Sequence, residues 1–351
     1  MHRLSGAPFE TIEEAVGSLV AVQAQDFAGA KWALGLRTNK SDIEIDEAFA
    51  EGRIVRTHVL RPTWHFVLPR DLRWLLALTA PRICKTLALQ DAKLGIDARL
   101  LAKAHEVMKR VLEREKYLTR EEIAEHLAAK KIVVAGQALA HVVMYAELDG
   151  LICSGPRRGK QFTYALLENR IPPSTNVLSH DEALEALALR YFDGHGPATI
   201  ADFAWWSGQT LTDAKEATKR LRAHLVESEI CRATHYASVH AADVENDEHE
   251  PTSLRLLPAF DESLVAYEDR DAFFPPELAT NLPRGNFWLS SSVIARDGKA
   301  VGTWRRTLVK GGVQVECSLF VKLGSGERKA LDAAIAGYAS FLGLPLRTNA
   351  H

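Results

Sequence analysis

The chain lacks long apolar runs, closely spaced cysteines and an apolar leader. No stretch of about 18 consecutive apolar residues occurs, so the sequence contains no predicted membrane span. The opening residues 1–5 do not form the apolar core of a signal peptide. The four cysteines lie far apart without any CxxC pair, which is typical of reduced thiols and not of a disulfide framework or a zinc site. These absences predict a cytoplasmic protein with no bound metal.

Short motifs of several enzyme classes are also missing. The sequence contains no P-loop, no GxGxxG after a predicted strand, no GxSxG, no HExxH and no EF-hand loop. Its thirteen histidines are scattered along the chain. We therefore expect no cofactor to take part in the chemistry.

The composition is that of a globular protein with a nearly balanced charge. With 351 residues, of which 47% are hydrophobic and 25% charged, the chain is long enough for two or three domains. The net charge of −2 argues mildly against binding nucleic acid, but the distribution of charge matters more than its sum. Acidic residues gather at 243–250, whereas basic residues gather at 53–61, 156–160 and 305–306. This segregation is compatible with one basic face.

The stretch Val22–Asp26 stands between two helical patterns. Apolar residues recur at helical spacing before it and after it, and Asp26 suits the N-cap of the second helix. In a continuous helix, Gln23 and Gln25 would lie about 200° apart around the axis. In an extended junction, residues two apart share a face, and both amides could meet one ligand. By themselves, two glutamines at a helix end are more often solvated or capping residues.

Residues 1–95 have the outline of a winged helix, in which three helices precede a two-stranded ribbon. A capping box at Ser41 marks the start of the third helix. The other expected elements are helices near 10–23 and 27–37 and strands near 53–59 and 61–68.

The second of these strands alternates in polarity, so its two faces differ. The expected core side carries Pro62, Trp64, Phe66 and Leu68. The opposite side carries Arg61, Thr63, His65 and Val67. A polar strand face is usually just solvated, and the alternative is a row of contacts to a ligand.

Residues 96–172 repeat the winged-helix outline. A capping box at Thr119 opens the second helix, and a basic turn between two glycines joins the two strands. Arg157, Arg158 and Lys160 at this turn could touch phosphate as a DNA-binding wing does, or they could be an ordinary charged turn. The expected elements are helices near 97–115, 119–130 and up to 150, and strands at 151–153 and 162–166.

Residues 173–351 follow a stiff proline linker and begin with a capping box at Ser179. Thr199 opens the second helix of this unit, as Thr119 does in the preceding one, which indicates an internal repeat. A helix at 211–226 takes the third-helix place, and Trp205–Trp206 are expected to fill the core. Strands near 288–295, 300–309 and 313–321, with Asp297–Gly298 and Gly311–Gly312 at their turns, precede a helix at 326–342.

Two pairs of adjacent charged residues in this region are candidate functional groups. Asp261 and Glu262 would face opposite ways on a strand and make a poor catalytic dyad, so we expect structural carboxylates. Arg305 and Arg306 lie within one predicted strand, so at most one of them faces a given partner.

Four blocks resemble the AlkZ-type winged-helix DNA glycosylases and follow the same order along nearly the whole chain. Any one block is unspecific, whereas four in order form a fairly specific pattern. The blocks are Val22–Arg37, Leu60–His65, Leu257–Glu262 and Val301–Arg306.

This resemblance implies an α+β, mainly helical fold with three tandem winged helices in a C-shaped monomer around a DNA duplex. Additional β-hairpins and a C-terminal helix belong to the third unit. In that family a glutamine–apolar–glutamine motif supports hydrolysis of the N-glycosidic bond of N7-alkylated purines, including bulky adducts and cross-links. The matching motif assigns the catalytic role to Gln23 and Gln25. The residues expected to contact DNA are Arg61, Thr63, His65, Arg157, Arg158, Lys160, Arg305 and Arg306.

Two other functions are compatible with the same pattern. A winged-helix DNA-binding protein or transcriptional regulator without catalytic activity would share the repeat and the basic wing. A protein that uses winged helices for protein contacts would fit the net charge of −2. Release of a damaged base separates the first reading from both alternatives, and salt-sensitive binding of duplex DNA separates the last two.

Overall fold

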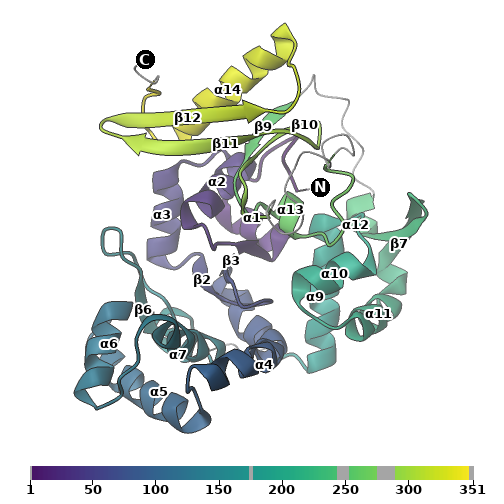
Figure 1. Ribbon diagram of the computed structural model, residues 1–351. Coiled ribbons are helices and arrows are strands. Elements are labelled where there is room, and N and C mark those ends of the chain that lie inside the picture. The colour runs from purple at the N-terminus through teal and green to yellow at the C-terminus, as the bar shows by residue number, and fades with distance from the viewer. Residues whose placement is uncertain (1, 174–176, 243–252, 275–288, 348–351) are drawn as a thin grey trace.

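The computed structural model describes residues 2–173, 177–242, 253–274 and 289–347. Its helices and small antiparallel sheets form three repeated units and a C-terminal sheet (Figure 1). Each unit runs helix, strand or bridge, helix, helix and two strands, which is the order of a winged helix. The fold is therefore α+β and mainly helical, as predicted. The acidic stretch 243–250 lies outside the described residues.

The first unit begins at a capping box on Thr11, and a second capping box on Ser41 starts its third helix. Its three strands pair in the order β1-β3-β2. The helix predicted up to residue 23 ends at Leu19, because Val20 has a φ of 64° and the next three residues pair with β3. The elements are α1 (Ile12–Leu19), β1 (Ala21–Gln23), α2 (Phe27–Thr38), α3 (Asp42–Glu51), β2 (Val55–His58) and β3 (Trp64–Val67).

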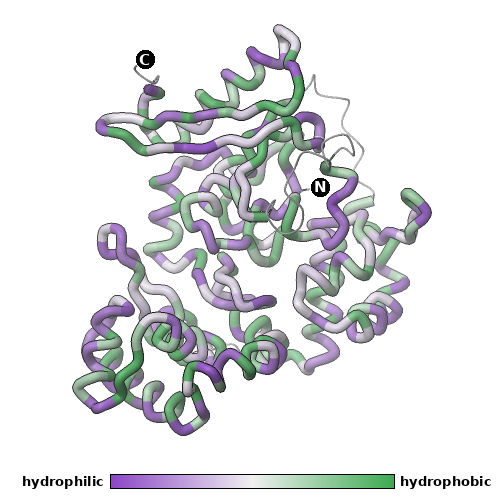
Figure 2. Tube along the Cα trace, in the orientation of Figure 1, coloured by the Kyte–Doolittle hydropathy of each residue, from purple (hydrophilic) through white to green (hydrophobic). Residues whose placement is uncertain are grey.

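A long helix, α4 (Pro69–Lys93), leads from the first unit to the second, and the sequence reading missed it. In the second unit, the sheet order is β4-β6-β5, and Thr119 caps the second helix as predicted. The tube in Figure 2 alternates in hydropathy along the first helix of this unit, α5, which buries Met108 and Leu112. The elements are α5 (Ala98–Leu112), β4 (Leu118–Thr119), α6 (Arg120–Ala129), α7 (Gly136–Leu148), β5 (Ile152–Ser154), β6 (Thr163–Leu166) and α8 (Leu167–Arg170).

The third unit reduces its first strand to one bridge, between Ala198 and Tyr236. Capping boxes on Ser179 and Thr199 start its first two helices as predicted. The helix predicted to run to residue 226 ends at Arg220, and a hairpin that the sequence reading missed forms the wing. The elements are α9 (His180–His195), α10 (Ile200–Ser207), α11 (Leu211–Arg220), a 3-10 turn (Arg222–His224), β7 (Leu225–Ile230), β8 (Ala233–Ser238) and α12 (Val239–Ala242).

The C-terminal region forms a four-stranded sheet in the order β12-β11-β10-β9. Asp297 and Gly298 both have positive φ at the β10–β11 turn, the geometry that an Asp-Gly hairpin favours. The last helix presents Leu331 and Tyr338 to the core, as its periodicity predicted. The elements are β9 (Leu254–Leu257), α13 (Glu262–Val265), β10 (Val293–Arg296), β11 (Lys299–Val309), β12 (Gly312–Leu319) and α14 (Ser325–Phe341).

The three units follow an arc, the C-shaped arrangement that the sequence predicted, with the first unit in the middle (Figure 1). One face of the first unit's sheet, including Val22 and Phe66, shares a core with the C-terminal sheet. The other face, including Ala21 and Val67, shares a core with α4 and with the third unit. The first unit is thus covered on both faces of its sheet.

Because both faces of this sheet are covered, the exposure of residues 61–68 differs from the prediction. Phe66 and Leu68 are buried as predicted, but Pro62 is exposed. His65 and Val67, on the side expected to be solvated, are also fully buried. The third unit packs over that side, which is why alternation alone gave the wrong exposure.

A buried ion pair between Arg37 and Asp261 connects α2 to the residue that precedes α13. The Arg37 guanidinium donates to both carboxylate oxygens of Asp261 at 2.9 Å, and neither side chain is exposed. Burial raises the pKa of Asp261, but Arg37 and the hydrogen bonds from Ser263 outweigh it, so the pKa lies below its ordinary value. Asp261 is therefore a structural carboxylate, as expected.

We predict that Asp261→Ala lowers the free energy of unfolding by about 3–5 kcal/mol, because Arg37 is left as an uncompensated buried charge. Urea denaturation measures this change. The pair stabilises the fold above the unfolded-state pKa of Asp261, and its contribution is lost as pH falls through the lower folded-state pKa. Wild type should accordingly lose more stability than the variant on acidification below about pH 4.

The control is Glu106→Ala, which breaks an exposed pair with Arg110 on α5. Exposed pairs contribute little, so its urea midpoint should match wild type. An Asp261→Ala midpoint equal to that of the control would show that the buried pair is dispensable.

Candidate active site

Gln23 lies on β1, an edge strand of the first unit, and not on the helix that the sequence predicted. Its backbone N–H donates to Glu262 Oε1 at 2.9 Å, so it points away from β3. The cross-strand pair of Gln23 and His65 is therefore of the narrow, non-hydrogen-bonded type, in which Cα atoms lie about 4.5 Å apart. The two side chains are neighbours on one face of the sheet.

A hydrogen bond to the amide oxygen fixes the Gln23 side chain. Oε1 accepts from Arg61 Nη2 at 3.0 Å, and the side chain is 7% exposed. A guanidinium only donates, which fixes the amide with its oxygen toward Arg61. Burial lowers the pKa of Arg61, while the Glu262 carboxylate raises it. Arg61 also lies 5.8 Å from the centre of the Trp205 ring.

Gln25 follows two residues later, beyond the end of β1, and is exposed. Asp26 next to it caps α2 as predicted, by accepting from the Gly29 N–H at 3.1 Å. Arg306 on β11 donates to both oxygens of Asp26 at 3.2 Å. The junction is therefore extended, with Gln23 buried at the end of β1 and Gln25 exposed at the surface.

His65 is neutral and buried. Its Nδ1 donates to the Thr63 carbonyl at 2.9 Å, so Nε2 carries the lone pair. Burial lowers the pKa of His65 well below its ordinary value, and the Arg61 charge lowers it further. Among the described residues, Nε2 has no hydrogen-bond partner, and neither have the hydroxyls of Thr57 and Thr63. Three unsatisfied polar atoms thus line the sheet face beside Gln23.

Three of the residues predicted to contact DNA, Arg61, Thr63 and His65, lie beside Gln23 and are partly or fully buried. His65 has no exposed surface, and the Thr63 hydroxyl oxygen is also buried. Arg61 is half-buried, donates to Gln23 and lies over the Trp205 ring. Contact between these three residues and DNA stays a prediction.

The sequence reading missed the part that Glu262 plays at this site. Its carboxylate is 1% exposed and accepts from the Gln23 backbone and, at 3.0 Å, from Trp206 Nε1. Trp206 fills the core as expected, whereas Trp205 stays half-buried between Arg61 and Arg270. The block Leu257–Glu262 drew attention to Glu262. Its contact with Gln23 could not be predicted, because 239 residues separate the two in the chain.

The other predicted DNA contacts come from the second unit and from β11, and most of them have carboxylate partners. Arg157 lies 5.0 Å from the Phe27 ring centre and 3.9 Å from Asp46. Arg158 pairs with Glu122, Arg305 with Glu316 and Arg306 with Asp26, so Arg305 and Arg306 do face opposite ways. Lys160 is exposed at the wing and forms no ion pair within the described ranges.

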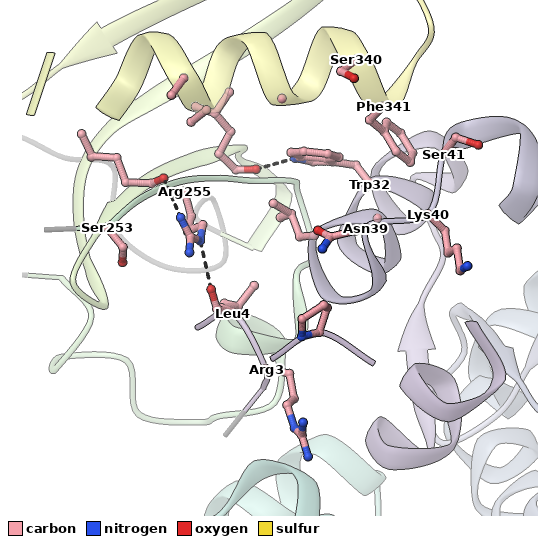
Figure 3. Close-up of a pocket in the computed structure, with 18 of the residues that line it drawn as sticks. Arg3, Leu4, Trp32, Asn39, Lys40, Ser41, Ser253, Arg255, Ser340 and Phe341 are labelled. Carbon is pink, nitrogen blue, oxygen red and sulfur yellow. Dashed lines mark hydrogen bonds between the residues drawn. The ribbon is translucent and has the colours of Figure 1, made fainter. Parts of the chain in front are cut away.

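A separate cavity of about 820 Å³ lies between α2, β9, α14 and the first residues of the chain (Figure 3). Two polar groups of its wall are tied to backbone carbonyls: Arg255 Nε donates to Leu4 and Trp32 Nε1 to Leu256. None of the residues that the sequence predicted for catalysis or DNA contact lines it.

The part of the chain that the structure describes shows neither a metal cluster nor a membrane-spanning helix. It contains no group of three or more His, Cys, Asp or Glu side chains arranged to hold a metal ion. None of its helices combines the length and the apolar character needed to cross a membrane.

Comparison with known proteins places this geometry in a family. The model of the AlkZ-like DNA glycosylases matches residues 16–341. An interstrand DNA cross-link repair glycosylase from Streptomyces sahachiroi is 26% identical over 302 residues, which cover 83% of this chain and 81% of the relative.

The solved structure of Streptomyces sahachiroi DNA glycosylase AlkZ superposes with a TM-score of 0.80 at 23% identity. The superposition covers 99% of this chain and 95% of that chain, so the two share one fold over their whole length. With the family model matched over nearly all of its residues, this chain belongs to the AlkZ-like DNA glycosylases, enzymes that hydrolyse N-glycosyl bonds.

Proposed function

We propose that this enzyme releases N7-alkylated purines from double-stranded DNA, with Gln23 orienting the attacking water and Gln25 assisting. The observation that carries the proposal is the fixed amide of Gln23, with Oε1 held by Arg61 two residues before the exposed Gln25. The similar Streptomyces sahachiroi protein is named for cross-link repair, which supports a substrate range that includes bulky adducts and cross-links.

The substrate explains why such mild side chains suffice. Alkylation at N7 gives the purine a positive charge, so the base is already a good leaving group. Water bonds to the anomeric carbon, the bond to N9 breaks, and its electron pair neutralises the purine. The water proton passes to solvent. Little general-acid help is needed, and the enzyme's task is to place water against an oxocarbenium-like sugar.

Gln23 is suited to that task by its geometry. A carbonyl oxygen has two lone pairs, so Oε1 can accept from Arg61 and still accept from a water molecule. An amide is no base near neutral pH, but its oxygen offers partial negative charge to the developing cation. The hydrogen bond from Arg61 keeps that oxygen from rotating away.

The position of Gln25 supports bulky substrates. It lies exposed two residues beyond the end of β1, where an adduct would not need to enter a closed pocket. Enzymes that act on neutral bases flip the base into a tight pocket, which a bulky adduct would not fit. The exposed Lys160 of the second unit offers an independent contact to phosphate.

We predict that Gln23→Ala reduces release of N7-methylguanine from a duplex by roughly a hundredfold or more, the cost of losing one preorganised polar group. The released base is measured after incubation of wild type and variant with a duplex that contains a single lesion.

Gln137→Ala is the matched control, because Gln137 is an exposed glutamine on α7 in the second unit. It should release base at the wild-type rate. Equal release by Gln23→Ala and wild type, at equal folded fraction, would contradict the assigned role. Absence of release by wild type itself would contradict the proposed substrate.

We also predict that Lys160→Ala weakens duplex binding and flattens its salt dependence. One lost phosphate contact should reduce the slope of log K against log salt concentration by about 0.9. Binding titrations at several salt concentrations measure the slope.

Lys329→Ala serves as the comparison, because Lys329 is exposed on α14, which lies at the opposite end of the molecule from the second unit in Figure 1. It should leave the slope unchanged. If the two lysine variants behave alike, the wing does not contact phosphate.

A further inference from the structure

We propose that Glu262 is a positioning residue for Gln23 and that it controls the rate of base release. This inference rests on the proposed function, because it concerns the same amide. The carboxylate holds the backbone at Gln23 and also stabilises the cation that holds the side chain, so both ends of the residue depend on it.

The backbone contact comes first. Gln23 sits on an edge strand, so its N–H has no partner within the sheet. The Glu262 carboxylate supplies that partner at 2.9 Å from 239 residues along the chain. A buried N–H without an acceptor is rare in folded proteins, and charged acceptors form the stronger hydrogen bonds. The contact therefore fixes where the Gln23 side chain leaves the strand.

The second carboxylate oxygen is tied to the third unit. Trp206 Nε1 on α10 donates to Glu262 Oε2 at 3.0 Å, and His195 Nε2 lies 3.5 Å from the same oxygen. Because Glu262 is only 1% exposed, its carboxylate cannot itself meet the sugar or the water. Its effect on the reaction must pass through the residues that it holds.

Arg61 is the second of those residues. The burial of its guanidinium disfavours the charged form, and among the charges that act on it Glu262 favours that form while Arg270 opposes it. Arg61 in turn donates to Gln23 Oε1. Loss of the Glu262 charge would leave Arg61 next to Arg270 without this support, and we expect it to release the amide oxygen.

Asp261 provides a matched comparison within the same chain. It is the preceding residue, is equally buried and is also a carboxylate. It binds Arg37 and Ser263 and makes no hydrogen bond to Gln23. Neutralising either carboxylate should cost stability, but only the change at Glu262 should alter the chemistry.

The experiment is single-turnover release of N7-methylguanine by excess full-length wild type, Glu262→Gln and Asp261→Asn. The amplitude reports the folded fraction, and the rate constant reports the geometry of the folded site. We expect the Glu262→Gln rate constant to fall roughly tenfold or more, since a misplacement of about 1 Å can cost a hundredfold. Asp261→Asn should lose amplitude at most, and duplex affinity should be the same for all three.

Trp206→Phe is the second variant, because it removes one hydrogen bond to the carboxylate but keeps the charge. Its rate constant should fall less than that of Glu262→Gln. Wild-type rate constants for the folded fractions of both variants would overturn the positioning role. Failure of wild type to release base would overturn the proposed function instead, so the two failures are distinguishable.

Discussion

The hydrogen bond from the Gln23 backbone to the Glu262 carboxylate is the contact on which the site depends. A buried carboxylate is costly to desolvate unless its oxygens are satisfied. Here the partners come from β1 of the first unit and from Trp206 of the third, while Glu262 itself belongs to α13. The charge is satisfied only when all three segments have assembled, so formation of the site is coupled to folding of the whole chain.

The three winged-helix units share one order of elements but differ in what covers them. The first unit is buried on both faces of its sheet, between the C-terminal sheet and the third unit. Arg61, Thr63 and His65 of this unit therefore lie partly or fully buried beside Gln23. The second unit keeps an exposed wing with Lys160. The same order of elements thus surrounds the buried Gln23 in the first unit and carries the exposed Lys160 in the second.

Local signals in the sequence predicted local structure well. The capping boxes at Ser41, Thr119 and Ser179 start helices, because the side chain and the backbone that it bonds lie three residues apart. The Asp297–Gly298 turn is local in the same way. Motif order predicted the family and the fold. In contrast, the end of α1 was misread, since the apolar residues before Gln23 fit helix and strand alike until β3 pairs with them. The burial of His65 and the contact of Glu262 with Gln23 could not be predicted in this way. Both depend on segments that lie far apart in the chain, so no short sequence pattern contains them.

The most direct test of the central claim is a crystal structure with a duplex that carries one N7-methyl-2′-fluoro-deoxyguanosine, in which the fluorine slows cleavage. The arrangement of Gln23 on β1 predicts that the anomeric carbon of the lesion faces the Gln23 and Gln25 amides, with a water molecule bound to Gln23 Oε1. Backbone phosphates should lie near Lys160. A duplex bound with its lesion remote from β1, or a Gln23 amide turned away from the sugar, would contradict the claim.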